Sequence, residues 1–248
     1  MAATDQQPAP PGADERKPTP RRVVLVRHGQ TTFNVEGRLP GQLPNVALTD
    51  EGRRQAHQAA VALAASPLSL VVSSPLERAY DTAQIIARGW GLEVRTDERL
   101  KDTDLGEWAG LKLDELTKTT PDWKRFVQEP EFAPPGGESL AYVMARAVTV
   151  VEDLRRDERA GDLVVLVAHA DVIKFIIGHY QGSSVTAAAR LHVANASISA
   201  LRFEGEEPPQ VLAVNWTASP GWLLPPLAPA AGTARAPAAA TPETAPLA

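Results

Sequence analysis

Short apolar runs rich in valine, leucine and isoleucine alternate with segments of helical periodicity along most of the chain. Six runs have the length and the β-branched content of strands, and they span residues 22–27, 68–74, 92–96, 162–168, 197–203 and 210–215. Because these runs are continuous rather than alternating, we expect strands that are covered on both faces. The alternation of strand and helix predicts an α/β three-layer sandwich, with a mostly parallel central sheet and helices on both faces.

Helix start signals support three of the segments between the runs. Ser74, Pro75 and Glu77 have the pattern of an N-cap, a first-turn proline and a capping box, which predicts a helix that begins at Ser74. Ser139 is expected to begin a second helix with a continuous apolar stripe, and Thr49 is expected to cap a third. These signals therefore predict where three of the helices between the strands begin.

Composition limits the regular part of the chain to a single domain. The sequence has 248 residues, of which 44% are hydrophobic and 22% are charged, as in ordinary globular proteins. Twelve of the 22 prolines fall in residues 1–20 or 220–248, and the second region is mostly Ala, Pro and Thr. We therefore predict disordered tails at 1–20 and 220–248, and one folded domain at 21–219.

Charge and cysteine content exclude several classes of function. The formal net charge of -5 argues against binding to nucleic acid or to an anionic membrane surface, because both need a basic surface. The absence of cysteine excludes disulfides, thiolate metal sites and a cysteine nucleophile. No signal peptide or segment of about 20 apolar residues is present, so a cytoplasmic location is expected. No histidine pair has a familiar zinc spacing, so no metal site is predicted.

Polar residues follow three of the apolar runs at the points where the runs end. In chain order they are Arg27, His28 and Gly29, then Ser73, Ser74 and Arg78, and finally His169, Ala170 and Asp171. Because ligands bind at the carboxyl ends of parallel strands, these side chains are expected to meet there. Several cations buried together need an anion, and the guanidinium fork of arginine matches phosphate oxygens. The sequence therefore predicts a site for a phosphoryl group.

Six motifs in chain order carry a family resemblance. They are "LVRHGQTTFN", "LTDEGRRQA", "SSPLERAYDTA", "LGEWAG", "PGGES" and "VAHADVIK", and with the sequence between them they cover about residues 22–203. Together they resemble the histidine phosphatase superfamily, in the branch that holds the phosphoglycerate mutases and their small phosphatase relatives. The resemblance implies a small phosphorylated substrate and catalysis without a metal or another cofactor.

The resemblance also implies a role for each residue that matches a motif. His28 corresponds to the nucleophile that forms a phosphohistidine, while Arg27, Arg78 and His169 correspond to the residues that hold the equatorial phosphoryl oxygens. The further expected substrate contacts are Asn34, Gly29, Gln30, Thr31, Arg38 and Ala170. A nucleophilic histidine must be neutral, and neighbouring cations disfavour its protonation. The same cationic cluster can therefore hold the phosphate and keep His28 deprotonated.

The acid that protonates the leaving group departs from the pattern of the family. Relatives usually supply a glutamate in a stretch resembling "LxExxxG", whereas "RLKDTDLGEWAG" has Asp102 at that position, with a side chain one methylene shorter. The register to Gly106 is intact, so Asp102 is expected to be the acid. Asp171 is the second candidate, because a distant branch of the superfamily places its acid directly after the second histidine. Asp104 and Glu107 are further alternatives.

The segment between the acid and the "PGGES" motif bears on the reaction. It is short, at about residues 106–137, which predicts a small helical lid rather than the long insertion of the mutases. Because a phosphatase must admit water, the short lid favours a phosphomonoester hydrolase. A phosphoglycerate mutase or another phosphomutase is the alternative, and a catalytically weak phosphate-binding module is the alternative of another class. Arg38 and Lys174 suit either a second anionic group of the substrate or a solvated surface, and the oligomeric state is left open.

Overall fold

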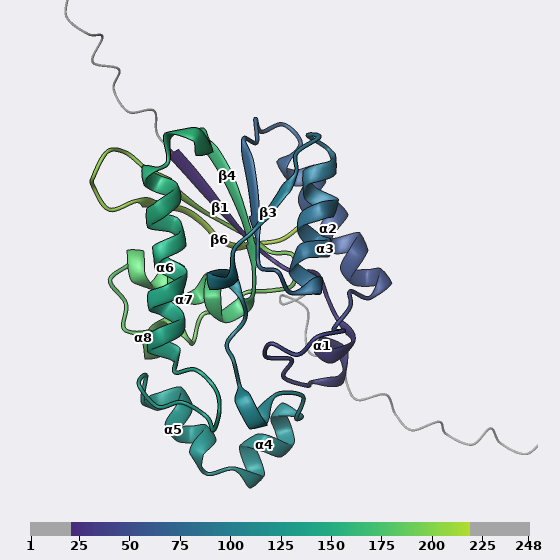
Figure 1. Cartoon of the computed structure of the whole chain (residues 1–248), viewed down its shortest axis with the longest axis vertical. Helices are drawn as coiled ribbons and strands as arrows, with labels where there is room; N and C mark the ends of the chain where they lie inside the picture. Colours follow the sequence, from purple (N-terminus) through teal and green to yellow (C-terminus); the bar gives the residue numbers. More distant parts are fainter. Residues whose placement is uncertain (1–20, 219–248) are drawn as a thin grey trace, which may run out of the picture. The chain divides into compact units, whose positions relative to one another are not determined.

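The computed structural model describes residues 21–218, which form one compact unit. The tails predicted at residues 1–20 and 220–248 lie outside the described residues. Within the described range, the predicted arrangement of a sheet between two helical layers is confirmed (Figure 1).

The sheet has six strands in the order β3-β2-β4-β1-β5-β6. Their bounds are β1 Arg21–Arg27, β2 Leu70–Ser73, β3 Val94–Thr96, β4 Leu163–Ala168, β5 Ile198–Phe203 and β6 Gln210–Trp216. The pairs β3–β2, β2–β4 and β4–β1 are parallel, whereas β5 is antiparallel to β1 and β6 is antiparallel to β5. The sheet is therefore mixed, with a parallel core, as the sequence predicted.

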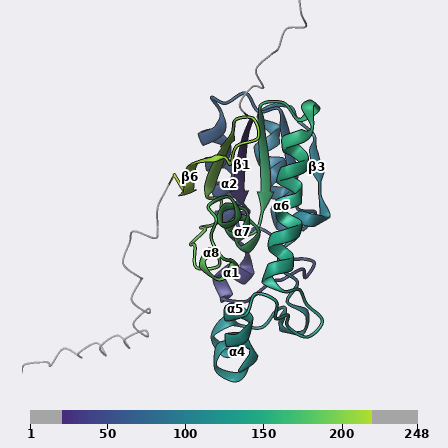
Figure 2. The ribbon, with the colours of Figure 1, turned by 90° about the vertical axis from the view of Figure 1, so that its left-hand side faces the viewer.

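Helices cover the two faces of the sheet. The helices are α1 Thr32–Glu36, α2 Asp50–Leu63, α3 Glu77–Arg88, α4 Leu113–Thr119, α5 Asp122–Gln128, α6 Leu140–Arg156, α7 Ala170–Tyr180 and α8 Val185–Ala188. Apolar residues of α2 and α3 pack with one set of strand residues, and those of α6 and α7 pack with the other set. Figure 2 shows the sheet between these layers. The alternation of buried strand residues between the two clusters follows from the period of two in a strand.

The register of the parallel strands aligns their carboxyl ends. Arg27 of β1 pairs with Ala168 of β4, and Ser73 of β2 pairs with Val167 of β4. The backbone N–H of His28 donates to the Ala168 carbonyl over 3.0 Å. The residues that follow the three strands therefore emerge side by side, as the polar breaks in the sequence predicted.

Two of the three predicted helix starts are confirmed, and the third is wrong. The Thr49 hydroxyl accepts the Gly52 N–H at the start of α2, and the Ser139 hydroxyl accepts the Tyr142 N–H at the start of α6. However, α3 begins at Glu77, three residues after Ser74, and no side chain caps it. The Ser74 hydroxyl is used instead by a histidine of the site, so a tertiary contact replaces the expected cap.

The edge strand β6 also departs from the prediction that both faces of every strand are covered. Its residues alternate between exposed and half-buried, and Leu212, Val214 and Trp216 are exposed. An antiparallel strand at the edge of a sheet can leave one face in solvent. The apolar sequence of β6 therefore does not indicate burial on both sides.

The predicted lid contains the short helices α4 and α5, which lie beyond the strand ends at the bottom of Figure 1. The rings of Trp108, Trp123 and Phe126 form a cluster with centroids 5.7 to 6.0 Å apart. Trp108 and Phe126 belong to the main apolar core. Leu111 and Leu113 of the same segment are exposed. A buried aromatic cluster thus fixes the lid to the domain.

Candidate active site

His28 follows β1 and is buried, with an exposed fraction of 2%. Its Nδ1 atom lies 2.7 Å from the carbonyl oxygen of Gly29. Because a carbonyl oxygen can only accept, Nδ1 must carry the proton and the neutral ring must hold its lone pair on Nε2. The backbone therefore selects the tautomer in which Nε2 is the nucleophilic atom.

Two arginines lie next to the buried histidine. Arg78 of α3 is 1% exposed, and its Nη2 donates to the Gly41 carbonyl over 2.8 Å and to Asp102 over 2.9 Å. The Nη1 atom of Arg27 donates to the Val193 carbonyl over 2.8 Å. The Nε atoms of both arginines are buried and have no hydrogen-bond partner among the described residues. Each arginine thus keeps a donor for an anion.

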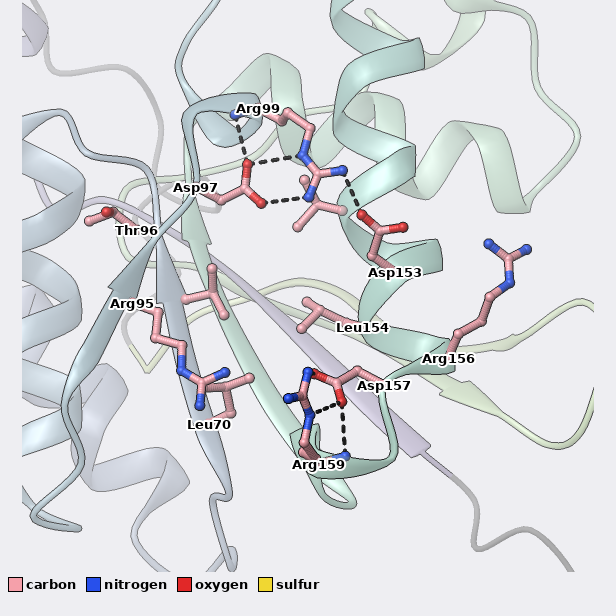
Figure 3. Close-up of a pocket in the computed structure, with 12 residues that line it drawn as sticks. Leu70, Arg95, Thr96, Asp97, Arg99, Asp153, Leu154, Arg156, Asp157 and Arg159 are labelled. Atoms are coloured by element: carbon pink, nitrogen blue, oxygen red, sulfur yellow. Dashed lines mark hydrogen bonds and ion pairs between the residues drawn. The ribbon is translucent and has the colours of Figure 1, made fainter.

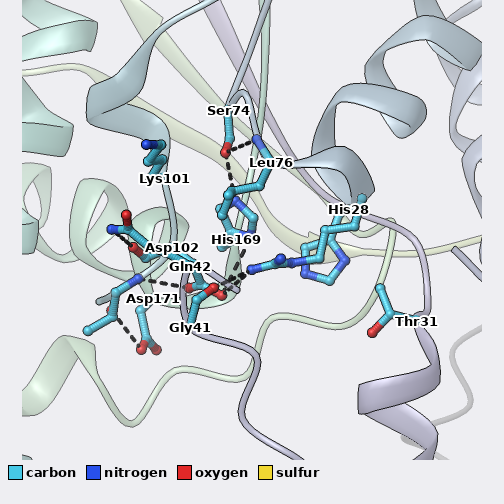
Figure 4. Close-up of polar contacts among 12 residues, drawn as sticks. His28, Thr31, Gly41, Gln42, Ser74, Leu76, Lys101, Asp102, His169 and Asp171 are labelled. Carbon is cyan, nitrogen blue, oxygen red and sulfur yellow. Dashed lines mark hydrogen bonds and ion pairs between the residues drawn. The ribbon is translucent and has the colours of Figure 1, made fainter. Parts of the chain in front are cut away.

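His169 follows β4 and is fully buried. Its Nε2 lies 2.9 Å from the Ser74 hydroxyl, and its ring centroid lies 5.2 Å from that of His28 (Figure 4). Its Nδ1 has no hydrogen-bond partner among the described residues, and the nearest carboxylate oxygen, Oδ2 of Asp102, is 3.6 Å away. The structure therefore brings together His28, Arg27, Arg78 and His169 as the sequence predicted.

Burial lowers the pKa of both histidines well below the ordinary value. For His28, the positive charges of Arg27 and Arg78, and that of His169 whenever it is protonated, add to the effect of desolvation, and the hydrogen bond to Gly29 opposes it. For His169, Arg78 and Arg27 add to desolvation. Burial likewise lowers the pKa of Arg27, while the carboxylates of Asp102 and Asp171 raise it. Both histidines are therefore neutral near pH 7.

This burial predicts a loss of stability in mild acid. Below pH 6.5, where a histidine ordinarily titrates, the unfolded chain binds protons that folded His28 and His169 do not bind. The free energy of unfolding should therefore fall by about 1.4 kcal/mol per pH unit for each of the two histidines. Urea unfolding between pH 6.5 and 5 measures this slope. His28→Asn and His169→Asn should each remove the contribution of one proton from this slope, about 1.4 kcal/mol per pH unit. If both variants keep the wild-type slope, the two histidines are not the groups that resist protonation in the folded protein.

Asn34 is held by the start of α1. The Thr31 hydroxyl caps the helix by accepting the Asn34 N–H, and Oδ1 of Asn34 accepts the Thr31 N–H over 3.0 Å. Asn195 also donates to this Oδ1, over 3.1 Å, and to the His28 carbonyl over 3.2 Å. With Oδ1 occupied, the Nδ2 amide of Asn34 is the group that can serve a ligand. Sequence reasoning missed Asn195, because no motif contains it.

Gly29 and Gln30 face helix α2 rather than the pocket described below. A β-carbon on Gly29 would lie 2.2 Å from the Gly52 carbonyl oxygen, and one on Gly52 would lie 2.1 Å from the Gln30 carbonyl oxygen. The side-chain oxygen of Gln30 accepts from the Thr49 hydroxyl over 3.0 Å. The absence of a side chain at Gly29 thus allows the backbone of Gly52 in α2 to approach closely. Gln30 and Thr31 act as supports in the structure, which differs from their expected place among the substrate contacts.

The two candidate acids both line the pocket that contains His28. Asp102 is an ion-pair partner of Arg78, and its Oδ1 accepts the Thr103 N–H over 3.0 Å. Asp171 accepts from Lys174 over 3.0 Å and from the Thr103 hydroxyl over 3.3 Å. Asp102 thus pairs with the buried Arg78, whereas Asp171 pairs with Lys174.

The pocket has a volume of about 220 Å³. Its lining residues are Arg27, His28, Asn34, Arg38, Leu39, Pro40, Gly41, Asp102, Thr103, Leu105, Ala170, Asp171 and Lys174. Ala170 is the first residue of α7, so the N-terminal end of that helix also borders the space. Arg38 stacks its guanidinium 4.6 Å from the centroid of the Phe33 ring and donates to the Gly110 carbonyl. The site is therefore a small cavity whose lining includes the cations Arg27, Arg38 and Lys174.

A clamp built on Arg146 holds the segment that carries Asp102. The Arg146 guanidinium donates to the backbone carbonyls of Arg99, Lys101 and Asp102 and to the Glu138 carboxylate, over 2.7 to 3.0 Å. Glu138 belongs to the "PGGES" motif and also accepts the Asp104 N–H over 3.0 Å. This clamp gives the motif a structural purpose. An arginine on an amphipathic helix gives no local signal of such a role.

A second cavity, of about 530 Å³, lies between β3 and α6. Figure 3 shows Arg99 paired with Asp97 and Asp153 and Arg159 paired with Asp157, whereas Arg95 and Arg156 have no partner among the residues drawn. None of the candidate site residues lines it. Of these ion pairs, the one between Arg99 and Asp153 joins the segment before Asp102 to α6, so it supports the same loop as Arg146.

Two structural surveys cover the described part of the chain. Among residues 21–218, no cluster of three or more His, Asp or Glu side chains is arranged to hold a metal ion. None of the helices in that range is long and apolar enough to cross a membrane.

Comparisons with known proteins agree with this geometry. The bifunctional protein Rv2228c of Mycobacterium tuberculosis is 36% identical over 214 residues, which are 86% of this chain and 58% of that protein. The chain thus spans little more than half the length of that relative. The glucosyl-3-phosphoglycerate phosphatase of the same organism is 41% identical over 164 residues, covering 62% of this chain and 72% of the relative.

Comparison with solved structures shows that the similarity includes the fold. The mycobacterial glucosyl-3-phosphoglycerate phosphatase in complex with VO3 matches 80% of this chain and all of its own, with a TM-score of 0.72 and 36% identity. The phosphoserine phosphatase of Entamoeba histolytica with 3-phosphoglyceric acid matches 80% of this chain and 98% of its own, with a TM-score of 0.70 and 27% identity. The model of the histidine phosphatase superfamily, branch 1, matches residues 23–217. The chain therefore belongs to branch 1 of the histidine phosphatase superfamily.

Proposed function

We propose that the protein is a phosphomonoester hydrolase that acts on a small phosphorylated metabolite through a phosphohistidine at His28. One observation carries the proposal: three buried nitrogen atoms, Nε of Arg27, Nε of Arg78 and Nδ1 of His169, have no hydrogen-bond partner among the described residues, and these side chains surround His28. The two guanidinium N–H groups can only donate, and buried donors of this kind suit the oxygens of a phosphoryl group. Relatives named as phosphatases of phosphorylated metabolites support the same class of substrate.

In the first step, the Nε2 lone pair of His28 attacks phosphorus. The P–N bond forms as the bond between phosphorus and the ester oxygen breaks, and a carboxyl group donates its proton to the departing oxygen. We assign this proton to Asp102. The negative charge of a bound phosphoryl group next to this carboxylate favours uptake of a proton there when substrate binds. Arg27 and Arg78 neutralise the charge that spreads over the equatorial oxygens.

In the second step, water attacks the phosphohistidine. The Asp102 carboxylate takes a proton from the water, the P–N bond breaks, and the electron pair returns to Nε2 of His28. Among the residues that line the pocket, none comes from the lid at 106–137. A pocket that the lid does not seal admits water, which favours hydrolysis over return of the phosphoryl group to a bound product.

Turnover in ¹⁸O-labelled water tests the proposed reaction. A panel of phosphorylated sugars, phosphorylated hydroxy acids and nucleotides is incubated with the protein, and ³¹P NMR detects the product. A hydrolase releases inorganic phosphate that carries one ¹⁸O atom, whereas a mutase gives an isomeric ester without ¹⁸O. The protein's own cations supply the charge neutralisation, so we expect EDTA to leave the rate unchanged.

Two results would contradict the proposal. An isomeric ester as the main product would make the protein a mutase. Phosphate binding by calorimetry without turnover of any compound in the panel would make it a binding module. The second result also has a direct check, since acid-labile, base-stable ³²P would then be absent from protein that is quenched during incubation with labelled substrate.

A further inference from the structure

The two buried histidines of the site are fixed by different kinds of hydrogen bond. His28 bonds to a backbone carbonyl, which can only accept, so its tautomer follows at once. His169 bonds to the Ser74 hydroxyl, which can donate or accept. The tautomer of His169 must therefore be found from the other bonds of Ser74 and from the surroundings of Nδ1.

The surroundings of Ser74 favour donation from its hydroxyl. The Leu76 N–H donates to Oγ of Ser74 over 3.3 Å, which uses one lone pair of the oxygen. Ser74 is fully buried, and within residues 21–218 its hydroxyl has no acceptor other than Nε2 of His169. A buried hydroxyl proton without an acceptor is costly. The hydroxyl thus donates to Nε2, which leaves the proton of the neutral ring on Nδ1.

The other side of the ring leads to the same tautomer. Nδ1 of His169 lies 3.6 Å from the carboxylate oxygen of Asp102. A protonated Nδ1 is attracted to that oxygen, whereas a lone pair on Nδ1 would be repelled by it. Two independent contacts, one on each ring nitrogen, therefore agree.

We propose that Ser74 is a positioning residue, which fixes His169 as the Nδ1–H tautomer so that this proton points at the transferred phosphoryl group. The role in the reaction rests on the proposed function. Nδ1–H can then donate to a phosphoryl oxygen without any change of protonation, while the opposite tautomer would present a lone pair to an anion.

Long-range ¹H–¹⁵N correlation spectra of ¹⁵N-histidine-labelled protein test the tautomer without any substrate. The His169 signals are assigned by their loss in His169→Asn. We expect a protonated Nδ1 and an unprotonated Nε2 in the wild type, and a mixture of tautomers in Ser74→Ala. We also expect kcat/KM and the affinity for vanadate to fall roughly tenfold in Ser74→Ala, which corresponds to one buried donor lost.

Ser73→Ala is the matched control. Ser73 is equally buried and adjacent in the chain, but its hydroxyl donates to the Ser74 carbonyl and does not contact His169. This variant should lose comparable stability and keep the wild-type tautomer. Ser74→Thr, which retains the hydroxyl, should keep the tautomer as well.

A wild-type signal with the proton on Nε2 would overturn the inference, and so would a Ser74→Ala variant with unchanged tautomer and unchanged kcat/KM. If Ser74→Ala fails to fold, the wild-type and Ser74→Thr spectra still decide the tautomer. A protein that shows the expected tautomer but hydrolyses no phosphoester would contradict the proposed function while leaving the assignment of the hydrogen bond intact.

Discussion

Replacement of His28 by alanine is expected to remove the phosphoenzyme and to lower turnover by about 10⁴-fold or more. Nε2 of His28 is the nucleophile of the first proposed step, and without its imidazole the P–N bond of the phosphohistidine cannot form there. Acid-labile, base-stable ³²P should accumulate in the wild type during rapid mixing with labelled substrate and be absent from His28→Ala. Released phosphate, measured in parallel, gives the loss of turnover.

Measurement of ligand binding distinguishes a variant that has lost only catalysis from one that has lost the structure of the site. Arg27 and Arg78 are unchanged in His28→Ala, so the variant should still bind inorganic phosphate or vanadate. His57→Ala provides the matched control, because His57 lies exposed on α2. A His28→Ala variant that retains labelled phosphoenzyme, with circular dichroism showing a native fold, would place the nucleophile elsewhere.

Replacement of Asp102 by asparagine is expected to lower turnover by roughly 10²- to 10⁴-fold for alkyl phosphates. Asparagine keeps the shape and can still accept from Arg78, but it has no proton to donate. A good leaving group such as p-nitrophenolate needs little protonation. The rate of His28 phosphorylation should therefore fall much less with p-nitrophenyl phosphate than with alkyl phosphates. Burst kinetics with the two substrates measure this difference.

Asp171→Asn is the matched comparison, since it is the same chemical change at another residue that lines the same pocket. Asp171 is engaged by Lys174 and Thr103, so we expect at most a few-fold change that does not depend on the leaving group. The converse pattern, with the large and leaving-group-dependent loss in Asp171→Asn, would transfer the role of acid from Asp102 to Asp171.

Local patterns were sufficient for most of the fold. The strands and the capped starts of α2 and α6 follow from burial and capping patterns encoded close in sequence, and the convergence of three strand ends follows from the general geometry of parallel sheets. The start of α3 does not, because the hydroxyl of Ser74 has a partner 95 residues away. The exposed face of β6 likewise depends on which strand lies at the edge, which periodicity alone does not specify.

In the site, motifs predicted the residues but not the contacts that support them. Arg27, His28, Arg78 and His169 were found because strand order brings their motifs to one edge. Arg146 and Asn195 were missed, since each acts only through partners that are distant in sequence. The partners of Gln30 were missed for the same reason: its surroundings are made by the neighbouring helix.

The contact between Gly29 and Gly52 restricts how the protein can be altered by directed evolution. A β-carbon at either position would collide with a backbone carbonyl rather than with a side chain. No compensating substitution elsewhere can clear that space, because only a shift of the main chain would do so, and such a shift would displace the adjacent His28. A library intended to change substrate preference should therefore keep these two glycines invariant and diversify Arg38 and Lys174 at the mouth of the pocket.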